Sequence, residues 1–177
     1  MTRTIRLFSW LPLILIAFSA CSPQPGPKTK TKDIVSANGK LRITVPAAWQ
    51  EKKGLNDSAD LQAAYTPSEM YVVVLSEPKE DLQDMTLEQH SKLTREALLT
   101  GVKDPVVTGP FALQVDGRPA VQYEIRGGVD HVKVVYLHVT VDGLKYYHQI
   151  LAWTVPSRFE ANKPTLEGVV QRFKELP

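Results

Sequence analysis

The chain has a single cysteine, Cys21, a residue whose thiol can be modified covalently, and it follows an apolar stretch near the N-terminus. Residues 1–6 carry two arginines and no acid, and residues 7–18 are almost wholly apolar. That stretch is too short to cross a bilayer, which takes about 20 residues, but it suits the core of a signal peptide. The small residues Ser19 and Ala20 leave a cleavage site open to a peptidase. One cysteine excludes an internal disulfide framework and a cysteine-rich metal site.

The run Phe18-Ser19-Ala20-Cys21 resembles the lipobox of bacterial lipoproteins, in which the cysteine becomes the first mature residue and is acylated. Phe18 stands where that motif usually has leucine, which implies slower processing. The resemblance implies that acyl chains on Cys21, palmitate among them, anchor the protein to a membrane and face it toward the periplasm. Ser22 is not the aspartate that commonly retains Gram-negative lipoproteins at the inner membrane, so the outer membrane is favoured. The alternative is an ordinary secretory signal with a chance cysteine.

Three divisions of the chain follow. Residues 1–20 are expected to be the lipoprotein signal peptide, residues 21–37 a tether rich in proline and lysine, and residues 38–177 a single domain. Residues 22–33 hold three prolines and no large apolar side chain, so they cannot build a core. In an extended form, at about 3 Å per residue, they would hold the domain some 30 Å from the bilayer.

The charge of the mature chain argues against a nucleic-acid partner. The formal net charge is +2, and residues 1–20 contain two of the arginines and no acid, so the remainder is neutral. A neutral domain has no field that would attract phosphate backbones. With 43% hydrophobic and 23% charged residues, the chain is neither disordered nor a multispanning membrane protein.

The four histidines are the candidate metal ligands. His138 and His148 fall on adjacent predicted strands, but a two-residue turn at Asp142-Gly143 directs them to opposite faces of the sheet, whereas a three-residue turn would reverse this. His131 and His138 also point in opposite directions along one strand. His90 lies at the edge of a helical apolar stripe, where a hydrogen-bonded boundary residue is expected. We therefore expect no metal site.

Candidates for other chemistry are weak. Cys21 is consumed as the anchor, and no serine lies in a Gly-x-Ser-x-Gly elbow. Residues 126–128, Arg-Gly-Gly, are read as a wide turn, because no helix with a Lys-Ser/Thr pair follows them as in a phosphate loop. We expect no enzyme and no cofactor, with an envelope hydrolase as a remote alternative. The possible paired carboxylates, better explained by solubility and the helix dipole, are Glu77, Glu80, Asp81 and Asp84.

Alternating or β-branched runs predict strands, and one stretch predicts a helix. The strands are expected at 41–45, 61–65 and 71–75, the last covered on both faces. The helix spans 86–100, capped by Asp84 or Thr86 and ended near Gly101. Its predicted inward side consists of Leu87, His90, Leu93, Thr94, Ala97 and Leu98.

Two Asp-Gly pairs predict β-hairpins, because this dipeptide tolerates the positive φ angles of a type I′ turn. The first hairpin joins 106–115 to 118–126, and the second joins 132–141 to 144–155. A two-residue turn in the second pairs Val141 with Leu144 and Leu137 with His148. Both faces of this hairpin are apolar, so we expect helices on both sides of an antiparallel sheet.

The C-terminal residues are expected to supply the second layer of helices. Ser157 and Glu160 have the spacing of a capping box for a short helix, and Pro164 begins another in its first turn. The stripe of that last helix contains Leu166, Val169, Val170, Phe173 and Leu176.

Together these segments resemble the PsbP-like family, named for an extrinsic photosystem protein, and within it the DcrB-type bacterial lipoproteins. The residues that carry the resemblance are 41–49, 78–82 and 115–120, with the final Val-Val and Phe stripe. It covers about 38–175 and implies an α+β fold, an α/β/α sandwich with a curved antiparallel sheet. Members of this fold mostly act as accessory or scaffold proteins, although fold alone does not fix function.

We therefore expect a lipid-anchored, non-catalytic envelope protein whose partners are the membrane, through acylated Cys21, and another envelope protein. The alternative is a lipoprotein that binds a small apolar or aromatic ligand between sheet and helix. The residues that would line such a groove are Tyr136, His138, Lys145, Tyr147, Gln149 and Trp153. The more conservative interpretation is that a helix covers this face.

Overall fold

The computed structural model describes residues 30–177. Cys21, the predicted signal peptide and residues 21–29 of the predicted tether lie outside the described residues. Within 30–177, no helix has both the length and the apolar character needed to cross a membrane. The strands are β1 (Thr31–Val35), β2 (Leu41–Pro46), β3 (Gln50–Glu51), β4 (Leu61–Tyr65), β5 (Met70–Pro78), β6 (Lys103–Val115), β7 (Arg118–Val129), β8 (Val132–Asp142), β9 (Tyr146–Thr154) and β10 (Phe173–Glu175). The helices are η1 (Thr66–Ser68), η2 (Lys79–Asp81), α1 (Leu87–Leu99), η3 (Pro156–Arg158) and α2 (Phe159–Gln171).

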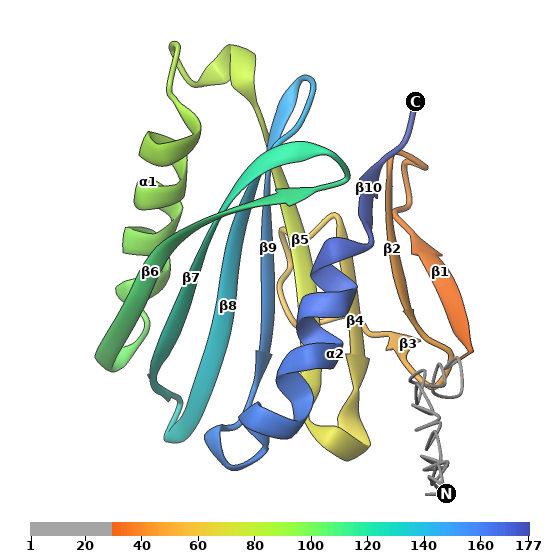
Figure 1. The fold of residues 1–177 in the computed structure, drawn as a ribbon, viewed down its shortest axis with the longest axis vertical. Helices are drawn as coiled ribbons and strands as arrows, with labels where there is room; N and C mark the ends of the chain where they lie inside the picture. Colours follow the sequence, from red (N-terminus) through yellow and green to blue (C-terminus); the bar gives the residue numbers. More distant parts are fainter. Residues whose placement is uncertain (1–29) are drawn as a thin grey trace, which may run out of the picture.

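Two antiparallel sheets and two α-helices form the layers (Figure 1). The large sheet has seven strands in the order β3-β4-β5-β9-β8-β7-β6, and the small sheet has three in the order β1-β2-β10. Helix α1 packs on β7, β8 and β9, whereas α2 packs on the other face of the large sheet and also contacts β2. This confirms the predicted α+β sandwich with helices on both sides of an antiparallel sheet.

Alternate residues of the central strands enter two separate cores. On β8, Val135, Leu137 and Val139 face α2 and the small sheet, and Val134 and Tyr136 face α1. The α2-side core is the larger and includes residues from both sheets. The small sheet thus closes the end of the sandwich that α2 leaves open.

The boundary between tether and domain differs from the prediction. Thr31–Val35, assigned above to the tether, forms β1 and pairs with β2 along its whole length. Only Ile34 of this strand is buried. An edge strand that buries one side chain has almost no hydrophobic pattern, so composition alone places it in the linker. The domain begins at Thr31.

The predicted helix forms as α1, with Thr86 rather than Asp84 as its cap. The Gln89 amide donates to Thr86 Oγ1 at 3.3 Å, and the Thr86 amide donates to Gln89 Oε1 at 2.8 Å, which completes a capping box. The predicted inward side is partly wrong. Leu93 is 50% exposed and Ala97 is exposed, because the helix turns a more polar side toward the sheet. The buried residues of α1 are Leu87, His90, Ser91 and Thr94.

Both Asp-Gly hairpins form, but the second has a longer loop. In the first, Asp116 and Gly117 have φ angles of 52° and 74° and make the expected two-residue turn. In the second, Val141 pairs with His148 instead of Leu144, so the register is shifted by four residues. An even shift keeps every side chain on its predicted face. Leu144 is left in the loop and is 71% exposed.

Residues 126–128 do not form the predicted wide turn. They continue β7, and the chain reverses at Asp130 and His131, whose φ angles are 46° and 68°. Gly127 is required for another reason. A Cβ atom there would lie 2.3 Å from Val102 Cγ1, so only glycine lets this side chain approach the strand.

The C-terminal prediction is corrected in two respects. Helix α2 runs without a break from Phe159 and contains Pro164, so the prediction that Pro164 begins a separate helix is wrong. Its N-cap residue is Arg158, whose side chain makes no capping hydrogen bond, so the predicted capping box is also wrong. The helix ends at Gln171. Phe173 then lies in β10, where it pairs with Ile43 of β2 and is 1% exposed.

Candidate functional site

Strand β6 is an open edge of the large sheet. It is 13 residues long, and Val115, its last residue, is its only buried member. In residues 30–177 no strand pairs with its outer side. Long open edges attract further strands, and proteins usually blunt them with charge or proline. Here Pro105 and Pro110 interrupt the row of amide donors, at the two register shifts of the strand.

The open edge carries exposed apolar side chains on both faces of the sheet. Val106 is 61% exposed, Phe111 48% and Val107 37%. Val106 and Phe111 lie opposite Arg126 and Gln122, on the α2 side, whereas Val107 lies opposite buried Ile125, on the α1 side. Single exposed apolar residues are ordinary, but three on one edge strand are typical of an interaction surface. We call these three residues the β6 edge.

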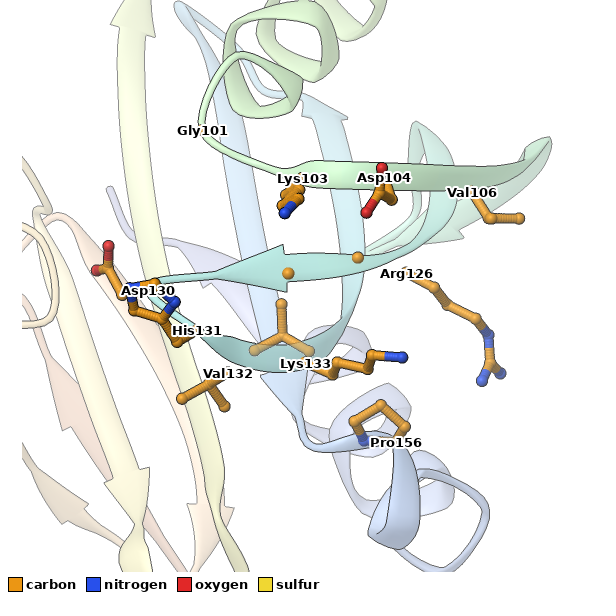
Figure 2. Close-up of a pocket in the computed structure, with 13 residues that line it drawn as sticks. Gly101, Lys103, Asp104, Val106, Arg126, Asp130, His131, Val132, Lys133 and Pro156 are labelled. Carbon is orange, nitrogen blue, oxygen red and sulfur yellow. The ribbon is translucent and has the colours of Figure 1, made fainter.

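A cleft of about 770 Å³ adjoins the first residues of β6 (Figure 2). It lies between the start of β6, the β7–β8 turn and Pro156. Gly127 and Gly128 line it without side chains, and the β6 register shift between Lys103 and Val106 lies beside them. Its charged lining residues are Lys103, Asp104, Arg126, Asp130 and Lys133.

The positively charged side chains of this cleft differ in whether other residues pair with them. Arg126 Nη2 lies 2.7 Å from Glu124 Oε1, and its guanidinium lies 4.8 Å from the centre of the Phe159 ring. Arg126 is therefore fixed by an ion pair and by an aromatic face. Lys103 and Lys133 are exposed and form no ion pair within the described part of the chain.

The aromatic face proposed as a ligand groove is packed. Trp153 stacks on Tyr71 at 5.3 Å between ring centres and lies 5.7 Å from Tyr136. Tyr147 stacks on His90 of α1 at 4.7 Å and donates a hydrogen bond to the Met85 carbonyl at 2.7 Å. A helix covers this face, as in the conservative interpretation.

Of the other predicted groove residues, His138 is buried beneath α1, Gln149 is half-buried and Lys145 is exposed. None of the three clefts we describe is lined by Tyr136, Tyr147 or Trp153. The second cleft lies on the outer side of α1 beside Leu93, and the third adjoins β10.

His138 and His148 point to opposite faces, as predicted, and each is held by a hydroxyl group. His138 Nε2 lies 3.2 Å from Thr94 Oγ1 under α1, and His148 Nδ1 lies 2.9 Å from Ser76 Oγ on the other face. His90 Nε2 lies 2.8 Å from Glu77 Oε2. Within residues 30–177, no three metal-ligating side chains come together.

Burial controls the protonation of two of these histidines. It lowers the pKa of His138 from 6.5 to about 4, and the nearby positive charge of Arg95 acts in the same direction. Burial also lowers the pKa of His148, although the Glu175 carboxylate opposes this shift. Both imidazoles are therefore neutral at pH 7.

Ser76, His148 and Glu175 adjoin one another in a smaller cleft of about 320 Å³. Ser76 and His148 pair across β5 and β9, but Glu175 Oε2 lies 3.8 Å from His148 Nε2, beyond hydrogen-bond distance. The carboxylate instead accepts from the Leu144 amide at 2.8 Å and so ties β10 to the β8–β9 loop. The sequence gives no signal for this cluster, because its members are far apart in the chain.

Comparisons with known proteins identify the class of fold. No family model matches the chain, and no curated protein matches it. Among solved structures, the cyanobacterial PsbP protein CyanoP of Synechocystis sp. PCC 6803 is 15% identical, with a TM-score of 0.61 over 89% of this chain and 98% of its own. The fold is therefore the PsbP-like α+β sandwich.

Two further structures extend this class. LpqN of Mycobacterium tuberculosis, described as involved in cell envelope biogenesis, is 12% identical with a TM-score of 0.59 over 84% of this chain and 91% of its own. The Ran-binding protein Mog1p of Saccharomyces cerevisiae is 13% identical with a TM-score of 0.58 over 84% of this chain and 96% of its own. At such identities the likeness establishes the fold and leaves the activity open.

Proposed function

We propose that this protein is a lipid-anchored accessory protein of the bacterial envelope, of the DcrB type, which binds another envelope protein through the β6 edge. The observation that carries the proposal is the open strand with exposed Val106, Val107 and Phe111. Apolar side chains beside unpaired backbone groups suit a partner that adds a strand or covers the edge. The same fold includes an envelope-biogenesis protein and a Ran-binding protein, which supports a binding role.

The anchor part of the proposal rests on the sequence before the domain. Acylated Cys21 would hold the domain at the membrane on the periplasmic side, at the outer membrane rather than the inner because Ser22 follows the cysteine. Two or three acyl chains give durable anchoring, whereas one chain binds only marginally.

The non-catalytic part is supported by the clusters described above. Glu175 is engaged by a backbone amide, and Ser76 contacts His148 through Nδ1, so the serine lacks the relay of a hydrolase. The ligand alternative receives no such support, because the aromatic face is packed beneath α1.

Replacing both Val106 and Phe111 with glutamate should abolish partner binding. Two charges on the edge would have to be desolvated in any apolar contact, which is costly without a counter-charge. In-cell cross-linking of the natively anchored protein, followed by mass spectrometry, should recover one recurrent envelope partner from the wild type and lose it from this variant.

Leu144→Glu supplies the matched control, because Leu144 is an apolar residue more exposed than Val106 or Phe111 but lies in the β8–β9 loop, away from the β6 edge. It should retain the cross-linked partner. Equal recovery from the Val106→Glu/Phe111→Glu variant and the wild type would exclude the β6 edge as the binding surface.

Cys21→Ala should leave the precursor unprocessed and unacylated, because the thiol is the group to which lipid is attached. Metabolic labelling with a radioactive fatty acid and the electrophoretic mobility of the chain would both report this. Phe18→Leu, which restores the usual lipobox residue, should be processed at least as fast as the wild type. Normal maturation of Cys21→Ala would refute the lipid anchor.

A further inference from the structure

The cleft beside β6 contains a row of three residues across three strands. Gly128 of β7 pairs with Lys103 of β6 on one side and with Lys133 of β8 on the other. Directly paired residues project from the same face of a sheet. The two lysines, labelled in Figure 2, therefore lie on the strands on either side of a residue that has no side chain.

The spacing of this row suits a small anion. Adjacent strands lie about 4.8 Å apart, so the α-carbons of the two lysines are about 10 Å apart, with glycine backbone between them. A Cβ atom at Gly128 would meet no atom closer than 3.7 Å, so packing does not require glycine there as it does at Gly127. The absent side chain leaves the floor of the cleft open.

The two lysines of the row have no ion-pair partner in the part of the chain that the structure describes. Lys103 and Lys133 make no ion pair in residues 30–177, whereas Arg126, also in the cleft, is held by Glu124. Asp104 and Asp130 also line the cleft, but neither carboxylate forms an ion pair with Lys103 or Lys133 within residues 30–177. An anion bound in the cleft would give these lysines the counter-charge that no carboxylate supplies through an ion pair.

The position of the cleft indicates the source of the anion. In Figure 1, the β7–β8 turn and the start of β1, where the chain enters the domain, both lie in the lower half of the molecule, on opposite sides of it. Lys30 and Lys32 are also exposed at the start of β1. If Cys21 is anchored, the ten residues from Cys21 to Thr31 span at most about 35 Å. The start of β1 then stays within that distance of the membrane surface, and the lower half of the domain can approach the headgroups.

We propose that Lys103 and Lys133, on either side of Gly128, bind the phosphate of an anionic lipid headgroup. The choice of lipid rests on the anchor proposed above, whereas the anion site stands on the row itself. Each lysine near an anionic surface strengthens binding, and their joint removal should weaken it about 30-fold.

The test uses the full chain in nonionic detergent and the amide resonances of Gly127 and Gly128. Three probes are titrated separately: dihexanoyl-phosphatidylglycerol, dihexanoyl-phosphatidylcholine and inorganic phosphate. Phosphatidylglycerol should shift both amides saturably, and phosphatidylcholine should not. Lys103→Gln/Lys133→Gln should weaken the phosphatidylglycerol titration about 30-fold.

Lys40→Gln/Lys145→Gln removes the same charge from two exposed lysines of the cleft beside β10 and should leave the affinity unchanged. Equal shifts with phosphatidylcholine, or none with any probe, would overturn the proposal. Shifts with inorganic phosphate but not with phosphatidylglycerol would overturn the lipid source. A wild-type chain that is found without an acyl group but still binds phosphate would refute the lipid anchor and not the anion site.

Discussion

Replacing Phe173 with alanine is expected to lower the free energy of unfolding by about 3–5 kcal/mol. The side chain is 1% exposed and belongs to the α2-side core, where its ring centre lies 5.0 Å from that of His148. It also lies opposite Ile43, so its removal leaves a cavity where both sheets and α2 meet. Urea denaturation of the full chain, followed by tryptophan fluorescence, would measure the loss.

The control for this substitution is Leu144→Ala, which removes an apolar side chain of similar kind from a 71% exposed position. It should change stability by no more than about 0.5 kcal/mol. A loss below about 1 kcal/mol for Phe173→Ala would show that β10 does not close the core as described.

Local signals predicted the central sheet because each depends on few residues. Asp116-Gly117 sets a two-residue turn by its own backbone preferences, and alternation on β8 fixes which side chains face α2. The prediction that His138 and His148 point to opposite faces of the sheet is confirmed for the same reason. A loop longer by an even number of residues changes partners but not faces, so His138 and His148 stayed apart.

The errors arose where distant segments decide the structure. Leu93 looks buried by helical spacing, but α1 turns His90, Ser91 and Thr94 toward the sheet. Phe173 continues a helical stripe in sequence, yet β2 offers it a strand partner, and the helix ends first. Gly127 resembles a turn glycine, although its cause is the approach of Val102 from another segment.

The candidate site was not predictable from the sequence for a related reason. Val106, Val107 and Phe111 fall inside a correctly predicted strand, and nothing in their spacing distinguishes an edge strand from a central one. Exposure depends on the strand order, which places β6 last in the sheet. Likewise Lys103, Gly128 and Lys133 form a row only through the register of two hairpins.

The stability of the domain should fall as the pH falls from about 6.5 to about 4. The pKa of His138 is about 4 in the folded chain and 6.5 as the ordinary value, so in this interval the unfolded chain binds a proton that the folded chain does not. The contribution of neutral His138 to the free energy of unfolding is complete above pH 6.5 and is lost by about pH 4. A shift of this size corresponds to about 3 kcal/mol. His148, whose pKa burial also lowers, acts in the same direction.

Protonation of paired carboxylates also destabilises folded proteins in acid. The contribution of His138 to the pH dependence must therefore be isolated by substitution. Urea unfolding at pH 7.5 and at pH 4.5 should show a smaller difference for His138→Gln than for the wild type, by about 2–3 kcal/mol. His131→Asn is the matched control, because His131 is exposed in the β7–β8 turn and asparagine tolerates its left-handed backbone. It should keep the wild-type dependence. The same pH dependence in His138→Gln as in the wild type would mean that the imidazole beside Thr94 and Arg95 takes up its proton without leaving the core.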